Sequence, residues 1–303
     1  MDLSRLIEQF AQVEAESLGG GQMLPGLTLF RRTARSGIEA LLYEPVICLI
    51  LQGRKDTWIG DQSVSLGPGD ALVVSHDLPV QSRITLASPQ TPYLAVILTL
   101  DLAVLRGLQD ELAGLALPAS DGRSLAVTRA EPALLQALSR YLDLSPSPLD
   151  ARVLGPGVLR EVQYRLLLSP AGAMLRRLIV SGSHASRIAQ AIQRLRQEFH
   201  LPLGLPDLAR SAGMSVTSFH QHFKAITGTT PLQYQKDLRL IAARALLVDR
   251  AQSVAEAAYA TGYESATHFS HDYRRRFGRP PSRDAARDRA APVQASGHRA
   301  VEA

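Results

Sequence analysis

The same plan occurs twice in the stretch from Leu205 to Phe277: a short apolar helix, a turn that contains a glycine, and a second helix. In the first copy, Gly213 ends the first helix and Ser215 is well placed to cap the second. The apolar residues of this second helix recur at helical spacing and share one face: Phe219, Phe223 and Ile226. The other faces of the helix are left free to contact a partner.

In the second copy, residues 254–260 form the first helix, Gly262 lies in the turn and Ser265 is the cap. The apolar stripe recurs at Phe269, Tyr273 and Phe277. Between the copies, Pro231 opens a helix that runs through Leu247 and is about 25 Å long at roughly 1.5 Å per residue. Such a rod is long enough to hold two recognition helices in successive major-groove segments of DNA, which lie ~34 Å apart.

The residues that point away from the apolar stripes have the order that DNA contact requires. Short polar groups stand near the start of each second helix and cations follow one or two turns later, as base edges followed by phosphates would need. A single copy of this pattern could be an ordinary helical hairpin. Two tandem copies on a basic segment favour a DNA-binding unit.

Charge is distributed unevenly along the chain. Residues 1–180 hold 16 Lys and Arg against 18 Asp and Glu, a net charge of −2, whereas residues 181–290 hold 16 against 9, a net charge of +7. A solvated basic face without function is the alternative. Because the basic half coincides with the repeated helical plan, we interpret it as a surface for phosphates.

The length of 303 residues suggests two domains, and Cys48 is the only cysteine. There is therefore no disulfide framework and no cysteine-based metal site, which suits a reducing cytosol. The sequence contains no apolar run of the ~20 residues that a membrane span needs. The first residues lack the features of an export signal, so we expect a cytoplasmic protein without membrane contact.

An amphipathic helix is predicted over Asp2–Ser17, either laid on the following domain or only loosely attached. From Thr28 to Leu100, short β runs alternate with turns such as Gly60-Asp61, which predicts an all-β sandwich or a small cupin-type barrel. The candidate strands are Ile38–Tyr43, Val46–Gln52, Lys55–Ile59, Ser63–Leu66, Ala71–Val74, Val80–Ala87 and Tyr93–Leu100.

A metal site in this barrel is not expected. His76 is the only histidine before residue 184, no His-x-His pair exists, and Leu72 stands where a cupin motif would place a ligand. We interpret His76 as a surface or hydrogen-bonded loop residue and Cys48 as a buried thiol, with a sensor thiol as the alternative. A candidate ligand pocket in the barrel is assigned to Cys48, Ile50, Gln52, Trp58 and Tyr93.

Helical patterns return after Asp101, which is a plausible N-cap. Further helices are expected over Leu102–Leu112, Pro132–Leu144, Leu149–Leu168 (kinked or started at Gly155), Met174–Val180 and His184–His200. The helix expected over Leu149–Leu168 carries a wide apolar stripe at Leu159, Val162, Leu166 and Leu167. This helical layer covers the barrel or forms a dimer contact, and we favour the dimer contact.

The repeated unit resembles the DNA-binding domain of AraC/XylS-type transcription regulators over about 100 residues. The resemblance rests on Leu208-Ala-Arg-Ser-Ala-Gly-Met-Ser, on the run from Phe223 to Tyr234 (Phe-Lys-Ala-Ile-Thr-Gly-Thr-Thr-Pro-Leu-Gln-Tyr), on Arg239-Leu240 with Ala243-Arg244, and on Gly262-Tyr263-Glu264-Ser265 through Phe269 to Arg276-Phe277-Gly278.

The preceding part resembles the N-terminal domain of one AraC-type subfamily over about 60 residues. The matching segments are 42–45, Cys48-Leu49, 51–55, Pro68-Gly69-Asp70, 72–75, 77–80, 87–89 and Pro92-Tyr93-Leu94. The resemblance implies a sensor barrel for an unidentified small-molecule effector, a homodimer, and a transcription regulator that works with RNA polymerase, more often as an activator. It does not imply an enzyme.

The resemblance also implies roles for individual side chains. Base contacts fall to Thr217, His220 and Gln221 in the first unit and to Thr267, His268 and His271 in the second. Phosphate contacts are assigned to Ser215, Lys224, Ser265, Arg274 and Arg275. Many family members carry arginine where Gln221 and His271 stand, so the preferred DNA site is expected to differ. Asp237 in the linker helix is expected to face away from DNA.

We therefore expect an α+β protein in three parts. Residues 1–180 form a cupin-like sensor and dimerisation domain with appended helices, residues 181–283 form an all-α domain with two helix-turn-helix motifs joined by a linker helix, and residues 284–303 form a disordered tail. The predicted function is a DNA-binding transcription regulator without metal or cofactor. The alternatives are a metal-dependent cupin enzyme, a DNA alkyl-repair protein, and an assembly factor on DNA that needs no ligand.

Overall fold

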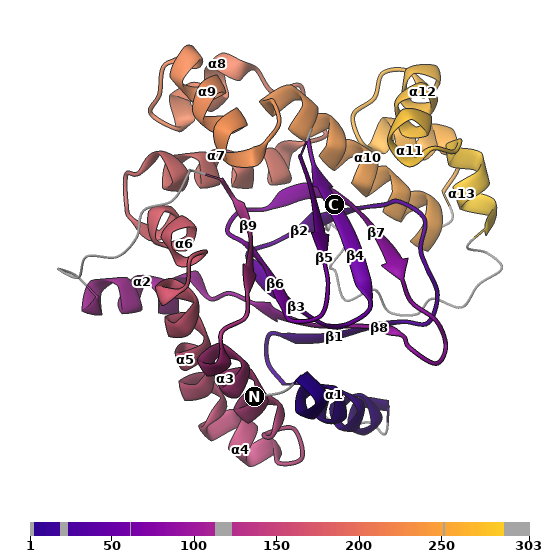
Figure 1. The fold of residues 1–303 in the computed structure, drawn as a ribbon. Helices are drawn as coiled ribbons and strands as arrows, with labels where there is room; N and C mark the ends of the chain where they lie inside the picture. Colours follow the sequence, from indigo (N-terminus) through magenta and orange to yellow (C-terminus); the bar gives the residue numbers. More distant parts are fainter. Residues whose placement is uncertain (1–2, 19–23, 61, 113–122, 251, 288–303) are drawn as a thin grey trace.

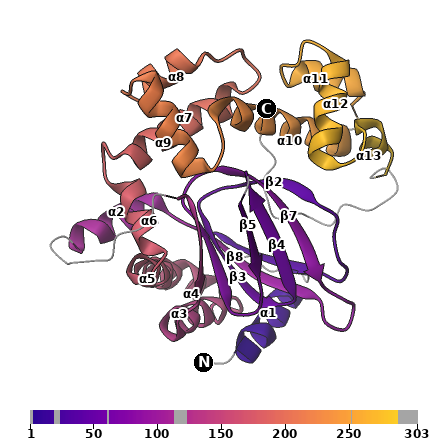
Figure 2. The same cartoon turned by 45° about the horizontal axis from the view of Figure 1, so that its top comes forward.

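The computed structural model describes residues 3–18, 24–60, 62–112, 123–250 and 252–287 (Figure 1). The turn residue Asp61 and the part of the predicted tail from 288 onward lie outside the described residues. Within them the chain forms an N-terminal region of two β-sheets with helices and a C-terminal region of helices alone, which lies across one end of the sheets (Figure 2).

The strands form two antiparallel sheets. A five-stranded sheet has the order β1-β8-β3-β6-β9, and a four-stranded sheet has the order β2-β7-β4-β5. The bounds are β1 (Leu27–Arg32), β2 (Glu39–Tyr43), β3 (Val46–Gln52), β4 (Arg54–Ile59), β5 (Gln62–Leu66), β6 (Asp70–Val74), β7 (Leu78–Leu86), β8 (Tyr93–Thr99) and β9 (Leu125–Arg129). No backbone pairing among the described residues joins the two sheets, so they form a sandwich, and the expected cupin-like barrel is not closed.

Strand β3 shows why the sandwich forms. Its side chains alternate between the two faces of the sheet. Cys48 and Ile50 point into the core between the sheets, whereas the alternate residues Ile47, Leu49 and Leu51 join a second core under the helices. A strand that is buried on both faces has a continuous run of apolar residues, and residues 46–51 form such a run.

Six helices belong to the described N-terminal region: α1 (Leu3–Leu18), α2 (Leu102–Glu111), α3 (Pro132–Leu142), α4 (Pro148–Val153), α5 (Gly155–Leu168) and α6 (Gly172–Ile179). Asp101 caps α2 as predicted, and the helical stretch is interrupted and restarts at Gly155. Leu6 and Phe10 of α1 are fully buried, and each such burial contributes about 1.5–3 kcal/mol. The alternative of a loosely attached N-terminal helix is therefore wrong.

The apolar stripe of α5 is used inside the molecule. Val162, Leu166 and Leu167 are fully buried in the core that the helices share with the outer face of the five-stranded sheet. Three of the four stripe residues therefore cover the sheet, and a dimer contact of this helical layer through other surfaces stays a prediction. The physical reason is that β3, β6 and β8 present apolar side chains on this face, which need a cover of their own.

The C-terminal region contains α7 (His184–Glu198), α8 (Leu205–Ser211), α9 (Val216–Thr227), α10 (Pro231–Asp249), α11 (Val254–Ala260), α12 (Ala266–Phe277) and α13 (Pro281–Arg287). Its helices form two separate cores, one around Phe219 and Phe223 and one around Phe269 and Tyr273. The linker helix α10 contributes to both cores and crosses from one unit to the other (Figure 1). Helix α13 continues to residue 287, past the predicted end of the domain at 283.

Strands β1 and β9 were not predicted. β1 pairs with β8, and β9 pairs with β6, where Leu125 lies opposite Val74 and Arg129 opposite Asp70. Each completes an edge of the five-stranded sheet, and each is short and half-exposed, so its pattern is weak.

Candidate DNA-binding interface

The first helix-turn-helix unit has the local geometry that its residues predict. Gly213 adopts the left-handed conformation, with φ +62°, which lets the chain turn between α8 and α9. The Ser215 Oγ accepts a hydrogen bond from the backbone N–H of Ser218 at 3.3 Å, so α9 begins where expected. Phe219 and Phe223 are fully buried and fix the rotation of the helix about its axis. Thr217 and Gln221 are consequently exposed.

The second unit repeats this construction. Gly262 has φ +83°, and a Cβ at this position would lie 2.1 Å from the carbonyl oxygen of His200, so only glycine fits the turn. The Ser265 Oγ accepts from the N–H of His268 at 3.4 Å and caps α12. The buried Phe269 and Tyr273 orient the helix. The predicted contact residues Thr267, His268, His271, Arg274 and Arg275 are all exposed.

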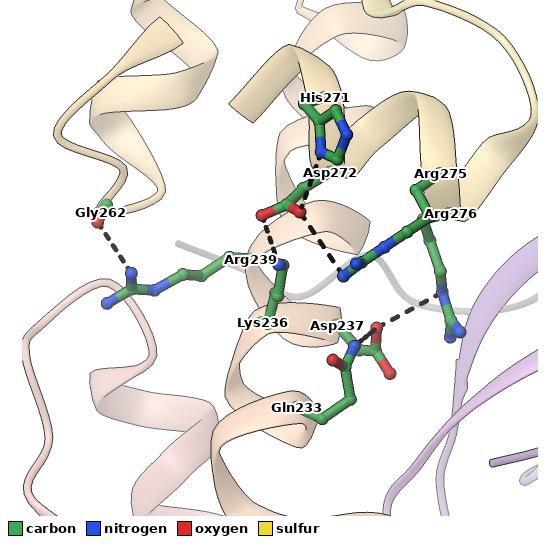
Figure 3. Close-up of polar contacts among 9 residues, drawn as sticks. All are labelled: Gln233, Lys236, Asp237, Arg239, Gly262, His271, Asp272, Arg275 and Arg276. Carbon is green, nitrogen blue, oxygen red and sulfur yellow. Dashed lines mark hydrogen bonds and ion pairs between the residues drawn. The ribbon is translucent and has the colours of Figure 1, made fainter. Parts of the chain in front are cut away.

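A polar network fastens the second unit to the linker helix (Figure 3). Asp272 of α12 receives the Lys236 ammonium of α10 at 2.5 Å and the Arg275 guanidinium at 3.6 Å. The His271 Nδ1 lies 3.8 Å from the same carboxylate. Arg275 and His271 therefore both lie beside the Asp272 carboxylate, which offsets part of the positive charge of Arg275.

A second carboxylate, Asp237, lies deeper in the same network. It accepts a hydrogen bond from the Gln233 side chain at 2.9 Å, and the Arg276 Nε lies 3.5 Å away. Burial raises the pKa of Asp237, and the Arg276 guanidinium opposes this effect. Asp237 thus faces the second unit, and its orientation away from DNA stays a prediction. Arg276 is largely buried and is therefore not part of a solvated run of charges.

The linker is also tied to the loop that precedes α8. The Arg239 guanidinium donates to the carbonyl oxygens of Phe199 at 2.7 Å, Gly262 at 2.8 Å and Leu201 at 3.0 Å. One side chain therefore joins the first unit, the linker and the turn of the second unit. Arg239 stands out in the sequence only through the family resemblance, because nothing in its local pattern shows that it satisfies three distant carbonyl groups.

The first recognition helix does not face solvent along its whole length. His220, Gln221 and Lys224 line a cavity of about 580 Å³ whose other wall comes from the N-terminal region. The structure therefore brings part of the predicted DNA-reading face against the sheets, while Thr217 lies outside this cavity lining. The two regions are held together by contacts that sequence analysis did not find.

These contacts centre on the segment 76–77 between β6 and β7. The Arg196 guanidinium of α7 lies 2.8 Å from the Asp77 carboxylate and 3.0 Å from the Glu44 carboxylate. The Tyr234 hydroxyl of α10 donates to the Asp77 carbonyl oxygen at 2.6 Å. The Gln81 side chain of β7 donates to the Arg276 carbonyl oxygen at 2.8 Å, so both helix-turn-helix units touch the N-terminal region.

The residues assigned to a pocket inside the barrel occupy different environments. Cys48, Ile50 and Tyr93 belong to the apolar core between the sheets, whereas the Gln52 side chain donates to the Pro92 carbonyl oxygen and Trp58 lies under the Arg83 guanidinium. Burial raises the pKa of the Cys48 thiol, although Lys55 lowers it. The thiol is therefore buried, as predicted, and protonated at neutral pH.

Among the described residues, no group of three or more His, Cys, Asp or Glu side chains is arranged to hold a metal ion. His76 is buried rather than on the surface, and it is hydrogen-bonded as the other half of the prediction stated. Within the same described part of the chain, no helix is both long and apolar enough to cross a membrane.

Two family models match the chain. One describes the AraC-type transcriptional regulator N-terminus and covers residues 23–174, and the other describes a helix-turn-helix domain and covers residues 208–287. The chain is 30% identical over 126 residues to the HTH-type transcriptional regulator ExsA of Pseudomonas aeruginosa, which covers 41% of this chain and 45% of ExsA. It is 31% identical over 177 residues to the HTH-type transcriptional activator RhaS of Salmonella schwarzengrund, which covers 57% of this chain and 62% of RhaS.

The chain thus spans about half the length of the curated relatives it matches. In three dimensions it is similar to ToxT from Vibrio cholerae, with a TM-score of 0.55 over 86% of this chain and 97% of the ToxT chain. The identity to ToxT is 12%, so this likeness shows the fold alone. The N-terminal family model by itself covers half of the sequence, and the second model covers the tandem unit. The protein therefore belongs to the AraC-type family of helix-turn-helix, DNA-binding transcription regulators.

Proposed function

We propose that the protein binds promoter DNA through α9 and α12, each lying in one of two successive segments of the major groove. The observation that carries this proposal is the pair of capped helices, each with a buried aromatic face and an exposed polar face, on one linker. The linker α10 has 19 residues and is therefore ~28 Å long. This length is close to the ~34 Å that separates successive major-groove segments.

In this proposal the exposed face of each helix divides into base contacts and phosphate contacts. Bases are read by Thr217, His220, Gln221, Thr267, His268 and His271. Phosphates are bound by Ser215, Lys224, Ser265, Arg274 and Arg275. The two capping serines accept backbone hydrogen bonds, and each hydroxyl hydrogen is left to donate to a phosphate oxygen.

We further infer that residues 1–180 respond to a small-molecule effector and dimerise, and that residues 181–283 bind DNA and contact RNA polymerase in the cytoplasm. The extensive contacts between the two regions support transmission of a signal from the sheets to the DNA-binding helices. An effector that changes the conformation of the sheets would change the residues against which α7 and α10 pack. An activator is favoured because RhaS is named a transcriptional activator. A regulator that only assembles partners on DNA would show no response to any effector.

The test of DNA reading is selection of bound sequences from a random pool, at fixed near-physiological salt because phosphate contacts dominate affinity. Full-length wild type is compared with Gln221→Ala, His271→Ala and the control Gln90→Ala, which changes an exposed loop residue far from both helices. We expect a two-part motif. Gln221→Ala should lose base preference in one half of the motif only, and His271→Ala should lose it in the other half. Each substitution should reduce the discrimination between bases by about 1–3 kcal/mol.

Two results would contradict the proposal. Both variants could select the wild-type motif, which would place base reading on other residues. Alternatively, the wild type could enrich no motif while its affinity falls steeply with salt, which would reduce the basic helices to a nonspecific surface.

A further inference from the structure

The imidazole of His271 lies beside the carboxylate of the next residue in α12, Asp272. The His271 side chain is 78% exposed, so its ring is open to a partner, whereas the Asp272 side chain is largely buried. The ring nitrogen nearer to the carboxylate is Nδ1, which lies 3.8 Å from the Asp272 Oδ1. The other ring nitrogen, Nε2, points away from the carboxylate (Figure 3).

The Asp272 carboxylate is held in place from the linker helix. The Lys236 ammonium of α10 lies 2.5 Å from its Oδ2, whereas the Arg275 guanidinium lies 3.6 Å from its Oδ1. Arg275 and His271 therefore approach one carboxylate oxygen, and Lys236 holds the other. Because the pair of Asp272 and Lys236 joins two packed helices, Asp272 is a fixed acceptor beside the imidazole ring.

The carboxylate bears on which ring nitrogen of His271 carries the hydrogen. A neutral imidazole has one nitrogen that donates and one that accepts through its lone pair. A carboxylate oxygen only accepts, so it attracts a hydrogen on Nδ1 and repels a lone pair there. At 3.8 Å the contact is longer than a hydrogen bond and acts through electrostatic attraction. Asp272 therefore favours the hydrogen on Nδ1, which leaves Nε2 as an acceptor on the exposed side of the ring.

The four bases differ in what they offer to an acceptor in the major groove. Adenine presents its N6 amino group and cytosine its N4 amino group, and both of these groups donate. Guanine presents the acceptors N7 and O6, and thymine presents the acceptor O4. An acceptor at the tip of a side chain is therefore matched by adenine or cytosine. An arginine side chain only donates and has the opposite preference, for guanine.

We propose that Asp272 is a positioning residue that sets the tautomer of His271, so that α12 reads the amino group of an adenine or a cytosine. The inference rests on the proposed role of His271 in base reading and adds the chemical identity of the base. It also gives Asp272 a role in specificity, separate from its role in fastening α12 to α10.

The tautomer is measured by nuclear magnetic resonance on the full-length protein at pH ~8.5, where imidazole rings are neutral. The ring nitrogens of the histidines are isotope-labelled, and the His271 signals are identified by their loss in His271→Gln. We expect the hydrogen mainly on Nδ1 in the wild type. The ratio of the two tautomers should fall at least ~5-fold in Asp272→Asn, which removes the charge. The control Asp207→Asn changes an exposed carboxylate of α8 and should leave the ratio unchanged.

Base preference is measured at the same pH on four DNA sites. They have identical spacing and carry each of the four base pairs at the position where His271→Ala loses its preference. His271→Arg identifies the contacted strand, because this variant should select guanine there. On that strand the wild type should prefer adenine or cytosine over guanine and thymine by ~10-fold.

Asp272→Asn separates the positioning role from a structural one. If Asp272 sets the tautomer, the variant should lose the preference for the amino bases at least ~5-fold, whereas Asp207→Asn should retain it. A purely structural role would weaken binding to all four sites equally and leave their ratio unchanged. The wild-type tautomer and the comparison with His271→Arg do not require that Asp272→Asn folds.

Three results would overturn the proposal. The wild-type ring could carry its hydrogen mainly on Nε2, the wild type could prefer guanine or thymine on the strand where His271→Arg selects guanine, or Asp272→Asn could weaken binding to all four sites equally. The tautomer measurement needs no DNA. A protein that selects no DNA motif would contradict the proposed function and base reading by His271, whereas a tautomer other than the expected one would contradict the positioning role alone.

Discussion

His76 links the two regions of the molecule through one imidazole ring. Its Nδ1 lies 2.8 Å from the Ser75 hydroxyl and 3.0 Å from the Ser124 hydroxyl, and its Nε2 lies 3.0 Å from the Ala185 carbonyl oxygen in α7. A carbonyl oxygen only accepts, so Nε2 carries the hydrogen and Nδ1 accepts from a serine. The hydrogen bonds are thus satisfied by the neutral ring. Burial lowers the pKa of His76 to about 4, and Arg177 adds to this effect.

The lowered pKa makes the stability of the fold depend on pH. An unfolded histidine titrates near ~6.5, so between pH ~4 and ~6.5 the unfolded state binds more protons than the folded state. The stabilisation is complete above this window and is lost as the pH falls through it. We expect the free energy of unfolding to decrease by about 2 kcal/mol from His76 alone between pH ~7.5 and ~5.

Urea unfolding at both pH values checks this expectation. His76→Gln should be less stable at neutral pH but should lose this part of the pH dependence, whereas His200→Gln, which changes an exposed histidine, should retain it. Equal pH dependence in wild type and His76→Gln would show that another group titrates.

At the scale of elements, Asp272 decides how α12 sits on α10. Its side chain is 14% exposed and faces Lys236, whose side chain is itself only 27% exposed. Removing one partner of a partly buried pair leaves the other charge without compensation. The surface pair of Asp207 and Arg210, exposed at 55% and 79%, has no such constraint.

We therefore expect Asp272→Asn to lower the free energy of unfolding by about 1–3 kcal/mol, and Asp207→Asn by no more than ~0.5 kcal/mol. Because Asp272 fixes the second unit on the linker, the variant should also tolerate an altered spacing between the two halves of the DNA motif. Binding to a set of sites with one base pair inserted or removed measures this tolerance. Unchanged spacing discrimination would show that Asp237 and Arg239 are sufficient to fix the unit.

How far elements are predictable from sequence depends on whether their signal is local. β3 was predicted with its observed bounds because residues 46–52 form an apolar run between turns, and the caps at Ser215 and Ser265 follow from side-chain chemistry and glycine turns. β9 was missed because five half-exposed residues become a strand only by pairing with β6. The surface against which the apolar stripe of α5 packs could not be predicted from the local sequence either, since an apolar stripe does not identify its partner.

At the scale of the whole molecule, the C-terminal region docks on residues that give no sign of it in the sequence. Leu42 alternates correctly for a strand of the sandwich, yet its side chain joins the core of the first helix-turn-helix unit. Nothing near Asp77 in the sequence indicates a charged partner, yet its carboxylate pairs with the distant Arg196. The predicted base-reading residues were placed on the intended helix faces. That one of these faces closes against the N-terminal region was not predictable, because docking depends on shape.

The contact between Gly60 and the end of α9 provides a test of this docking. Gly60 has φ +58°, so Gly60→Ala places a methyl group in a left-handed backbone, at a cost of roughly 1–2 kcal/mol, and 2.3 Å from the Gly228 carbonyl oxygen. Gly26→Ala is the matched control, because Gly26 has φ +71° and its added Cβ would meet nothing closer than 3.9 Å. Both variants carry the backbone strain, and only the first forces the hairpin away from α9.

The amide of Ser124 reports the separation, since it donates to Ile226 across the junction. We expect hydrogen exchange at this amide to be at least ~10-fold faster in Gly60→Ala than in Gly26→Ala, because local opening exposes the donor. Affinity for DNA should rise in the same variant, since His220 and Lys224 are released from the cavity between α9 and the N-terminal region. Equal exchange in the two variants would mean that the hairpin tip does not hold the regions together, and the restraint on α9 would then have to come from Arg196 and Tyr234.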